Sequence, residues 1–241
     1  ASRQAEWEKP SFMRELFLGT LRVDLIHPFP LPGADRAEFR AFFDQFTAFL
    51  RDEVDPVATD ATGEYPPHVL DGLRRPGAFG MKIPTEYGGL GLTMQSYARA
   101  LVLIGSVHPS LGAMISAHQS IGVPEPVKLV GTPEQKERFL PRCAAGAISA
   151  FLLTEPDVGS DPARMESTAT LTEDGTAYLL DGVKLWTTNG VVADLLVVMA
   201  RVPKTDGHRG GITAFVVEAD SEGITVENRN AFMGLRGIEN G

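Results

Sequence analysis

Apolar residues in the first part of the chain recur at the spacing of an α-helix. Between Phe39 and Leu50, phenylalanines and a leucine stand three and four residues apart, which predicts an amphipathic helix with one buried face. The same periodicity predicts helices at roughly 93–107 and 110–121, and a shorter one at 69–73. Helices are therefore expected to dominate the chain up to about residue 146.

A further helix start is marked by the four residues that begin at Thr132. Thr132 can cap the helix, Pro133 suits the first helical position, and Gln135 can reach back to the cap. By contrast, the glycine-rich segment 84–91 cannot be regular helix and is expected to form a loop.

After Gly146 the pattern changes to short runs of β-branched and aromatic residues, separated by glycine turns. Turn signals at this spacing favour an antiparallel β-sandwich or barrel. Because helices come first and strands later, the sequence predicts an α+β fold, an all-helical N-terminal domain followed by a β domain. The expected strands are Ile148–Leu153, Ser167–Thr172, Ala177–Leu180, Leu185–Thr188, Asp194–Ala200, Ile212–Val217 and Ile224–Val226.

Composition narrows the functional classes. The chain has 241 residues, 43% hydrophobic and 22% charged, as expected of a folded globular protein. Its formal net charge of −9 argues against general affinity for nucleic acid or anionic membranes, since both require a basic surface. The single cysteine, Cys143, cannot form an internal disulfide, and no apolar run approaches the roughly 20 residues of a membrane-spanning helix. The charged N-terminus lacks a signal-peptide pattern, so a cytoplasmic location is expected.

The segment from Phe151 to Asp161 is predicted to be a strand followed by a turn. Gly159 and Ser160 could bring backbone N–H groups close to a phosphate or carbonyl oxygen, because glycine lets the chain approach a ligand closely. A plain turn would also explain these residues, and on spacing alone it is the more usual explanation.

Trp186 raises a similar choice. A tryptophan in a strand is usually a core residue, since the indole buries a large area. Thr187 and Thr188 follow directly, however, and an aromatic face beside two hydroxyls suits a flavin, which needs a stacking partner and hydrogen bonds along its edge. In a strand, Trp186 and Thr188 would share one face while Thr187 points the other way.

Other candidate residues are weaker. His118 lies in a helical stretch and is interpreted as a hydrogen-bonded structural residue. The histidines and the cysteine do not have the spacing of metal ligands, so no metal site is predicted. No dinucleotide fingerprint, phosphate-binding loop or nucleophile elbow is present. Spacing alone therefore predicts two domains and no specific reaction.

Several segments nevertheless resemble the acyl-CoA dehydrogenase family, in order and in spacing. In the β part these are Leu153–Asp161 and Asp181–Gly190, and in the helical part Pro84–Gly89 and Gly131–Lys136. The segment Ala117–Gly122 is most similar to the very-long-chain branch. The resemblance covers nearly the whole chain.

The resemblance implies bound FAD, a fatty acyl-CoA substrate and α,β-dehydrogenation to the trans-2-enoyl-CoA. It also implies a role for particular positions. The positions expected along the flavin are Phe151, Leu153 and Thr154. The FAD pyrophosphate or the CoA part of the substrate would be met by Gly159 and Ser160. The isoalloxazine ring would be flanked by Trp186, Thr187 and Thr188.

A hypothesis about chain length follows from the same resemblance, which implies that the helix at 110–121 lines the acyl pocket. Its small residues occupy part of one helix face and would leave a deep slot, which favours long-chain substrates. Close packing against another helix would also favour small residues. The residues concerned are Gly112, Ala113, Ser116 and Ala117.

The sequence departs from the family at its C-terminal end. The family's catalytic glutamate lies in a C-terminal helical bundle, which is absent from these 241 residues. Glu155 and Glu239 are poor substitutes, because the first belongs to the flavin turn and the second lies near the end. No catalytic residue is therefore assigned, and little or no turnover is expected of the chain alone. The expected divisions are an extension at 1–34, a helical domain at 35–146 and a truncated β domain at 147–241.

Two alternatives remain open at this point. One keeps the fold but passes electrons to oxygen, as an acyl-CoA oxidase-like flavoprotein does. The other is a non-catalytic acyl-CoA-binding module. Under the leading interpretation, the resemblance implies an electron-transfer flavoprotein as acceptor and a homo-oligomer for the full-length enzyme.

Overall fold

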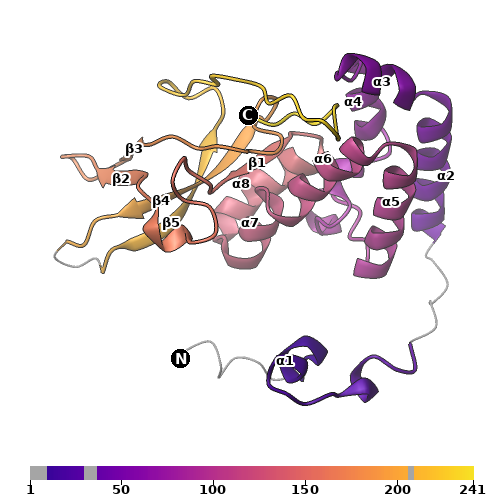
Figure 1. The fold of residues 1–241 in the computed structure, drawn as a ribbon, viewed down its shortest axis with the longest axis horizontal. Helices are drawn as coiled ribbons and strands as arrows, with labels where there is room; N and C mark the ends of the chain where they lie inside the picture. The colour runs from indigo at the N-terminus through magenta and orange to yellow at the C-terminus, as the bar shows by residue number, and fades with distance from the viewer. Residues whose placement is uncertain (1–9, 30–36, 206–208) are drawn as a thin grey trace. The chain divides into compact units, whose positions relative to one another are not determined.

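The computed structural model describes residues 10–29, 37–205 and 209–241. The chain divides into two compact units, Ala1–Asp35 and Arg36–Gly241. The first contains a short helix, α1 (Phe12–Phe17), and a 3-10 turn, η2 (Val23–Leu25). The second contains all the other elements, with helices toward one end and a β-sheet toward the other (Figure 1).

Helices form the first part of the second unit, as predicted. The expected helices at 39–50, 69–73, 93–107 and 110–121 are all confirmed, and so is the helix that starts after Thr132. The observed helices are α2 (Ala37–Asp52), α3 (Pro56–Thr62), α4 (Pro67–Arg74), α5 (Met94–Val107), α6 (Pro109–Ser120), α7 (Pro124–Val130) and α8 (Pro133–Ala144).

The start of α8 has the predicted capping geometry. The Thr132 hydroxyl accepts from the Gln135 backbone N–H at 3.3 Å, and the Gln135 side-chain oxygen accepts from the Thr132 N–H at 2.9 Å. Two helices were not predicted from the sequence, α3 and α7, and each is only seven residues long. Asp55 caps α3 and a left-handed Gly63 ends it, so local signals for α3 were present.

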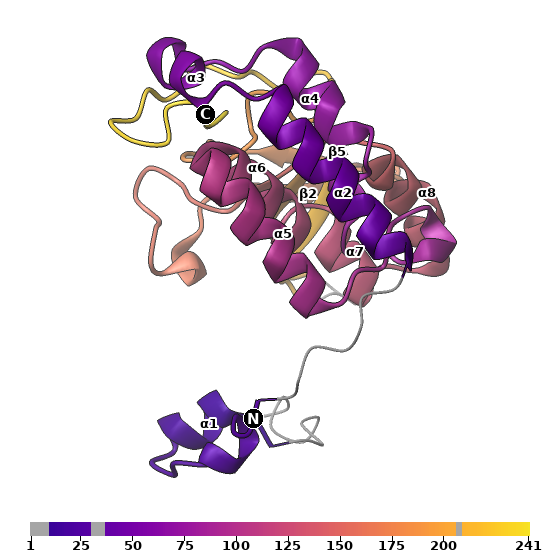
Figure 2. The same cartoon turned by 90° about the vertical axis from the view of Figure 1, so that its right-hand side faces the viewer.

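The helical core is built on the phenylalanine stripe of α2. Phe42 and Phe46 are buried and stacked with ring centroids 5.2 Å apart. Residues from α4, α5 and α6 complete this cluster, among them Leu73, Ile104 and Ile115. Helices α5 and α6 run side by side in both views (Figures 1 and 2).

A five-stranded sheet forms the second part of this unit, in the order β1-β4-β2-β3, with β5 on β4. The central strand β4 is antiparallel to β5 but parallel to β1 and β2. The sheet is therefore mixed and not purely antiparallel as expected, because pairing direction depends on how the chain returns to the sheet. The strands are β1 (Ser149–Leu152), β2 (Thr168–Leu171), β3 (Tyr178–Asp181), β4 (Leu195–Val202) and β5 (Gly211–Glu218).

Two predicted strands are wrong. Residues 185–188 form an irregular loop. Trp186 has a φ of 58°, and Asn189, directly after these residues, has a φ of 68°; neither value is compatible with a strand. The Asn-Gly pair at 189–190 is a turn signal that outweighs the β-branched content before it. Residues 224–226 are coil, since no other described segment pairs with them.

A second core cluster joins helices to sheet. Val127 of α7 and Leu140 of α8 pack with Leu195 and Val197 of β4. The sheet is thus supported on the side of α7 and α8. Among the described residues, no helix has both the length and the apolar character needed to cross a lipid bilayer.

Two helical glycines give a matched test of this packing. A Cβ added at Gly72 in α4 would overlap the buried Phe49 ring, whereas one added at Gly105 in α5 would meet nothing within 4 Å. Alanine favours helix over glycine by about 1 kcal/mol, so Gly105→Ala should raise the free energy of unfolding by roughly 0.5–1 kcal/mol. Gly72→Ala should lower it by roughly 1–3 kcal/mol because of overpacking. Urea unfolding measures the free energy of unfolding of both variants. Changes of the same sign would contradict the close packing at Gly72 and the open space at Gly105.

Candidate functional site

The two sequence motifs of the β domain lie side by side. The backbone N–H of Leu185 donates to the carbonyl oxygen of Thr154 at 2.9 Å. This bond joins the turn that follows β1 to residues 182–190, which lie between β3 and β4 and contain Trp186. This segment is called the Trp186 loop below. The segments predicted to form one site are therefore brought together, although no regular strand pairing connects them.

A buried ion pair holds the same junction. Lys184 Nζ donates to Glu155 Oε1 at 2.7 Å and to the Leu153 carbonyl oxygen at 3.3 Å. Glu155 also accepts from the backbone N–H groups of Glu166, at 2.6 Å, and Ser167, at 3.0 Å. Burial by itself would raise the pKa of Glu155, but the hydrogen bonds from Lys184, Ser167 and Glu166 together lower it to about 2. Glu155 is thus held as a charged structural residue.

The loop that begins at Trp186 presents its side chains on different sides. Trp186 is 59% exposed, Thr187 is buried and Thr188 is half-buried. Trp186 and Thr188 are thus both more exposed than Thr187, but they lie in a loop with a left-handed residue and not in the expected strand. The Trp186 indole lies 6.3 Å from the Phe232 ring, at an interplanar angle of 36°. An indole face and a threonine hydroxyl are therefore available next to the turn after β1.

The C-terminal segment also fastens this loop, which the sequence analysis did not foresee. Thr187 and Gly241 exchange two backbone hydrogen bonds, at 2.8 and 3.2 Å. Asn240 Nδ2 donates to Thr188 Oγ1 at 3.4 Å, so the Thr188 hydroxyl hydrogen is left free to donate elsewhere. No spacing pattern marks this segment, because it is coil.

The nearby carboxylate Glu239 is not free. Arg229 Nε donates to Glu239 Oε2 at 2.8 Å, and its Nη2 donates to the Gly63 carbonyl oxygen at 2.6 Å. Both carboxylates considered in the sequence analysis, Glu155 and Glu239, are therefore engaged in ion pairs.

The predicted anion-binding turn is open. Gly159 and Ser160 are exposed, and a Cβ added at Gly159 would meet nothing within 4 Å. Glu155 and Val158 pair across the turn, which leaves the backbone after it accessible. Open glycine backbone, an exposed indole and a free hydroxyl hydrogen suit a flat ligand that carries phosphate, so the residues present fit FAD.

The remaining residues expected along the flavin differ in their surroundings. Leu153 and Thr154 are half-buried beside the Trp186 loop. Phe151 is partly buried and packs against the second core cluster, which contains Val127 and Leu140. Its ring therefore contributes to the core between the sheet and the helices.

Helix α6 contacts this site through its backbone. Asn189 Nδ2 donates to the Met114 carbonyl oxygen at 3.0 Å. The four small residues of α6 that are proposed to line the acyl pocket are half-buried, in contrast to the buried Leu111, Met114 and Ile115. A Cβ at Gly112 would lie 3.5 Å from Gly105 Cα, which is an ordinary contact distance, so Gly112 faces α5 but its packing there does not require a glycine. The other three half-buried positions are Ala113, Ser116 and Ala117.

His118 has the structural role that its helical context predicted. It is fully buried, and its Nδ1 accepts from the Ser149 backbone N–H at 3.1 Å. Nε2 must then carry the proton, which it donates to the Phe79 carbonyl oxygen at 3.0 Å. Burial lowers the pKa of His118 to about 4, partly opposed by the bond to Phe79. The ring is neutral near pH 7 and joins α6 to β1.

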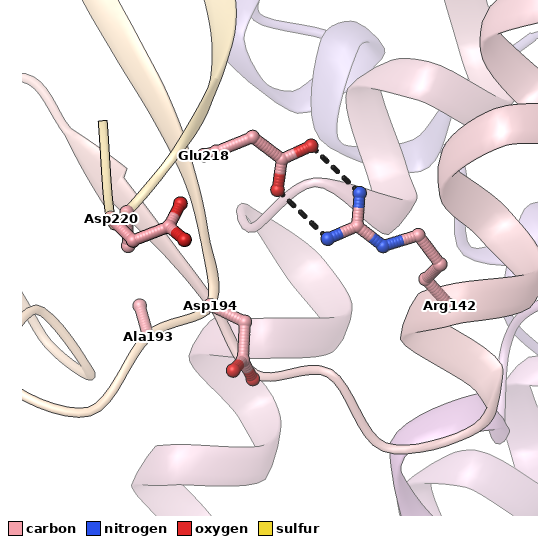
Figure 3. A pocket seen from close by; sticks show the side chains of 6 residues that line it. Arg142, Ala193, Asp194, Glu218 and Asp220 are labelled. Atoms are coloured by element: carbon pink, nitrogen blue, oxygen red, sulfur yellow. Dashed lines mark hydrogen bonds and ion pairs between the residues drawn. The ribbon is translucent and has the colours of Figure 1, made fainter. Parts of the chain in front are cut away.

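A separate pocket lies between α8 and the ends of β4 and β5 (Figure 3). Arg142 donates two hydrogen bonds of 2.8 Å to Glu218, and Asp194 accepts from the Ile148 N–H at 2.8 Å. Its charged groups are thus largely satisfied within the protein, and none of the motif residues lines it. Within the described ranges, no group of histidine, cysteine and carboxylate side chains is arranged to hold a metal ion.

The fold and site have counterparts in one protein family. Residues 36–147 match the model of the acyl-CoA dehydrogenase N-terminal domain, and residues 150–241 match that of the acyl-CoA dehydrogenase middle domain. The chain belongs to the acyl-CoA dehydrogenase family.

Individual relatives agree with this assignment. A probable acyl-CoA dehydrogenase, FadE10 of Mycobacterium tuberculosis, is 66% identical over the whole chain, which covers 37% of that protein. The human mitochondrial very long-chain specific acyl-CoA dehydrogenase is 37% identical over 97% of the chain and 37% of its own length. The structure also resembles a Bacillus anthracis acyl-CoA dehydrogenase complexed with FAD, with a TM-score of 0.72, 31% identity, and coverage of 87% and 36% of the two chains. The chain spans little more than a third of these relatives.

Removal of one partner tests the buried ion pair. Lys184→Met should lower the free energy of unfolding by roughly 3–5 kcal/mol, because it leaves the Glu155 carboxylate buried without its counter-charge. The double variant Glu155→Gln/Lys184→Met should lose less, since no buried charge remains. Arg51→Met, which breaks the exposed Arg51–Asp52 pair, should change little. Urea unfolding at pH 7 compares them, and equal losses in the single and double variants would contradict this role.

Proposed function

We propose that this chain is the flavin-binding part of an acyl-CoA dehydrogenase that converts a fatty acyl-CoA to its trans-2-enoyl-CoA. Family membership supports the reaction class, and the Trp186 loop beside the turn after β1 supports the cofactor. The domain divisions at 1–34, 35–146 and 147–241 are part of this proposal.

In this proposal, FAD supplies the acceptor for the hydride that leaves the β-carbon of the substrate. The chain's own residues bind and orient the cofactor. Trp186 offers a ring face, and Thr188 offers a hydroxyl hydrogen that Asn240 leaves free. Gly159 and Ser160 offer open backbone N–H groups for an anionic oxygen of the cofactor or of CoA. The flavin would also be surrounded by Phe151, Leu153, Thr154 and Thr187.

The proposal places the catalytic base outside these 241 residues. Abstraction of the α-proton requires a carboxylate able to accept it, and Glu155 and Glu239 are both committed to ion pairs. The much longer relatives support the same view. The proposal also includes an electron-transfer flavoprotein as electron acceptor, a homo-oligomeric full-length enzyme and a cytoplasmic location.

FAD titration of the purified chain tests the cofactor site. The chain should bind FAD, as measured by quenching of flavin fluorescence, and Trp186→Leu and Thr188→Val should weaken binding. Thr170→Val, at an exposed position of β2, is the matched control and should not. Added acyl-CoA should leave the flavin absorbance of the 241-residue chain unchanged. Bleaching by acyl-CoA would refute the placement of the base, and failure of the chain to bind FAD would refute the cofactor site.

The half-buried small residues of α6 support a finer proposal, a preference for long acyl chains. Ala113, Ser116 and Ala117 leave one face of α6 with little bulk near the Trp186 loop. In the complete enzyme, Ala117→Leu should lower kcat/KM for a sixteen-carbon thioester about tenfold relative to an eight-carbon one. Ala98→Leu, on the exposed face of α5, is the control. An unchanged preference would show that Ala117 serves only helix packing.

A further inference from the structure

Asn189 carries an unusual combination of features inside the Trp186 loop. It is fully buried, and its backbone has a φ of 68°, in the left-handed region. Its side chain points out of the loop and into the junction between the helices and the sheet. There Nδ2 donates to the Met114 carbonyl oxygen of α6 at 3.0 Å and to the Ser149 carbonyl oxygen of β1 at 3.2 Å.

The orientation of this amide is fixed by its partners. Both partners are carbonyl oxygens, so only the NH₂ end of the side chain can face them. Oδ1 is buried and has no hydrogen-bond partner among the described residues. The side chain therefore acts as a double donor that ties one loop to two elements.

The two acceptors are themselves held in place. Ser149 donates its backbone N–H to His118 Nδ1, and its hydroxyl accepts from the Val123 N–H at 3.0 Å. His118 in turn is anchored to the Phe79 carbonyl oxygen. His118 lies one turn after Met114 on α6, so helix and strand form a single rigid support under Asn189.

Asn189 also bears two free-energy costs. A left-handed backbone in a residue other than glycine and a buried unsatisfied acceptor are both unfavourable for the folded state. Such features persist where the surrounding structure over-determines them, commonly at ligand-binding loops. What the two donated bonds achieve here is a fixed position for the loop.

We propose that Asn189 is a positioning residue that fixes the Trp186 loop against α6 and β1. The Trp186 indole and the Thr188 hydroxyl are thereby held in place before FAD binds. This inference rests on the proposed function, because it assumes that the loop flanks the flavin. Asn189 itself does not touch the reacting atoms in this proposal. Its effect passes through the loop backbone.

Two variants separate the hydrogen bonds from the backbone conformation. Asn189→Gly accepts the left-handed backbone without strain but removes the amide. Asn189→Asp keeps the size and much of the left-handed tolerance of asparagine but replaces the double donor with a carboxylate. Leu235→Gly is the matched control, because Leu235 is another left-handed residue, with a φ of 53°, and is exposed.

The experiment uses a Trp7→Phe background, in which Trp186 is the only tryptophan. Time-resolved fluorescence anisotropy of Trp186, recorded without FAD, measures the mobility of the loop. Both Asn189 variants should show faster local motion of the indole, and Leu235→Gly should not. FAD titration should give a Kd about tenfold higher for both variants, which corresponds to about 1.4 kcal/mol. Circular dichroism should show that the secondary structure is retained.

The outcomes distinguish this inference from the proposed function. Failure of the parent chain to bind FAD would remove the proposed function, while the anisotropy would still decide whether Asn189 fixes the loop. Unchanged anisotropy or an unchanged Kd in a folded Asn189→Asp protein would overturn the inference and leave the cofactor site intact. Loss of folding in both variants, with Leu235→Gly folded, would also overturn it, because Asn189 would then serve the fold as a whole.

Discussion

A buried ion pair joins the two segments that make the site, where no regular strand pairing does. Lys184 Nζ and Glu155 Oε1 lie 2.7 Å apart, and Glu155 also accepts hydrogen bonds from two backbone N–H groups just before β2. A buried carboxylate is stable only when its hydrogen-bonding capacity and its charge are both met. The turn after β1, the approach to β2 and the Trp186 loop are therefore held together by one side chain. Leu153 and Thr154 are thereby held next to Leu185 in the Trp186 loop.

From this junction the loop is fixed on two further sides. Asn189 ties it to α6 and β1, and the C-terminal segment pairs with Thr187 through Gly241. The three attachments are made at Lys184, Thr187 and Asn189, and they link the residues Trp186 to Thr188 and their immediate neighbours to distant parts of the sequence. This arrangement leaves the indole exposed while the backbone beneath it is held, which is the condition for a preorganised binding surface. A related enzyme of the same fold, from Bacillus anthracis, is complexed with FAD.

Sequence patterns predicted the elements with strong local signals. The phenylalanine stripe of α2 and the cap of α8 were read correctly because periodicity and capping act within a few residues. Each of the five observed strands overlaps a predicted one, but Leu185–Thr188 and Ile224–Val226 are not strands. β-branched composition favours an extended chain, yet a strand needs a partner, and the sequence does not say where partners lie. For the same reason the parallel pairing of β4 with β1 and β2 was not foreseen.

The sequence by itself determined the order of helical and β parts and the family resemblance, on which the proposed flavin-binding residues rest. Only the tertiary structure decided how those residues are held. Glu155 was interpreted as part of a flavin turn, and its ion pair with Lys184 emerged once both were buried at one junction. Asn189 received no role from the sequence, and its hydrogen bonds to Met114 and Ser149 exist only because α6 and β1 pack beside the loop. Local backbone preferences act over a few residues and can be read along the chain, whereas burial and long-range hydrogen bonds arise only when distant segments pack together.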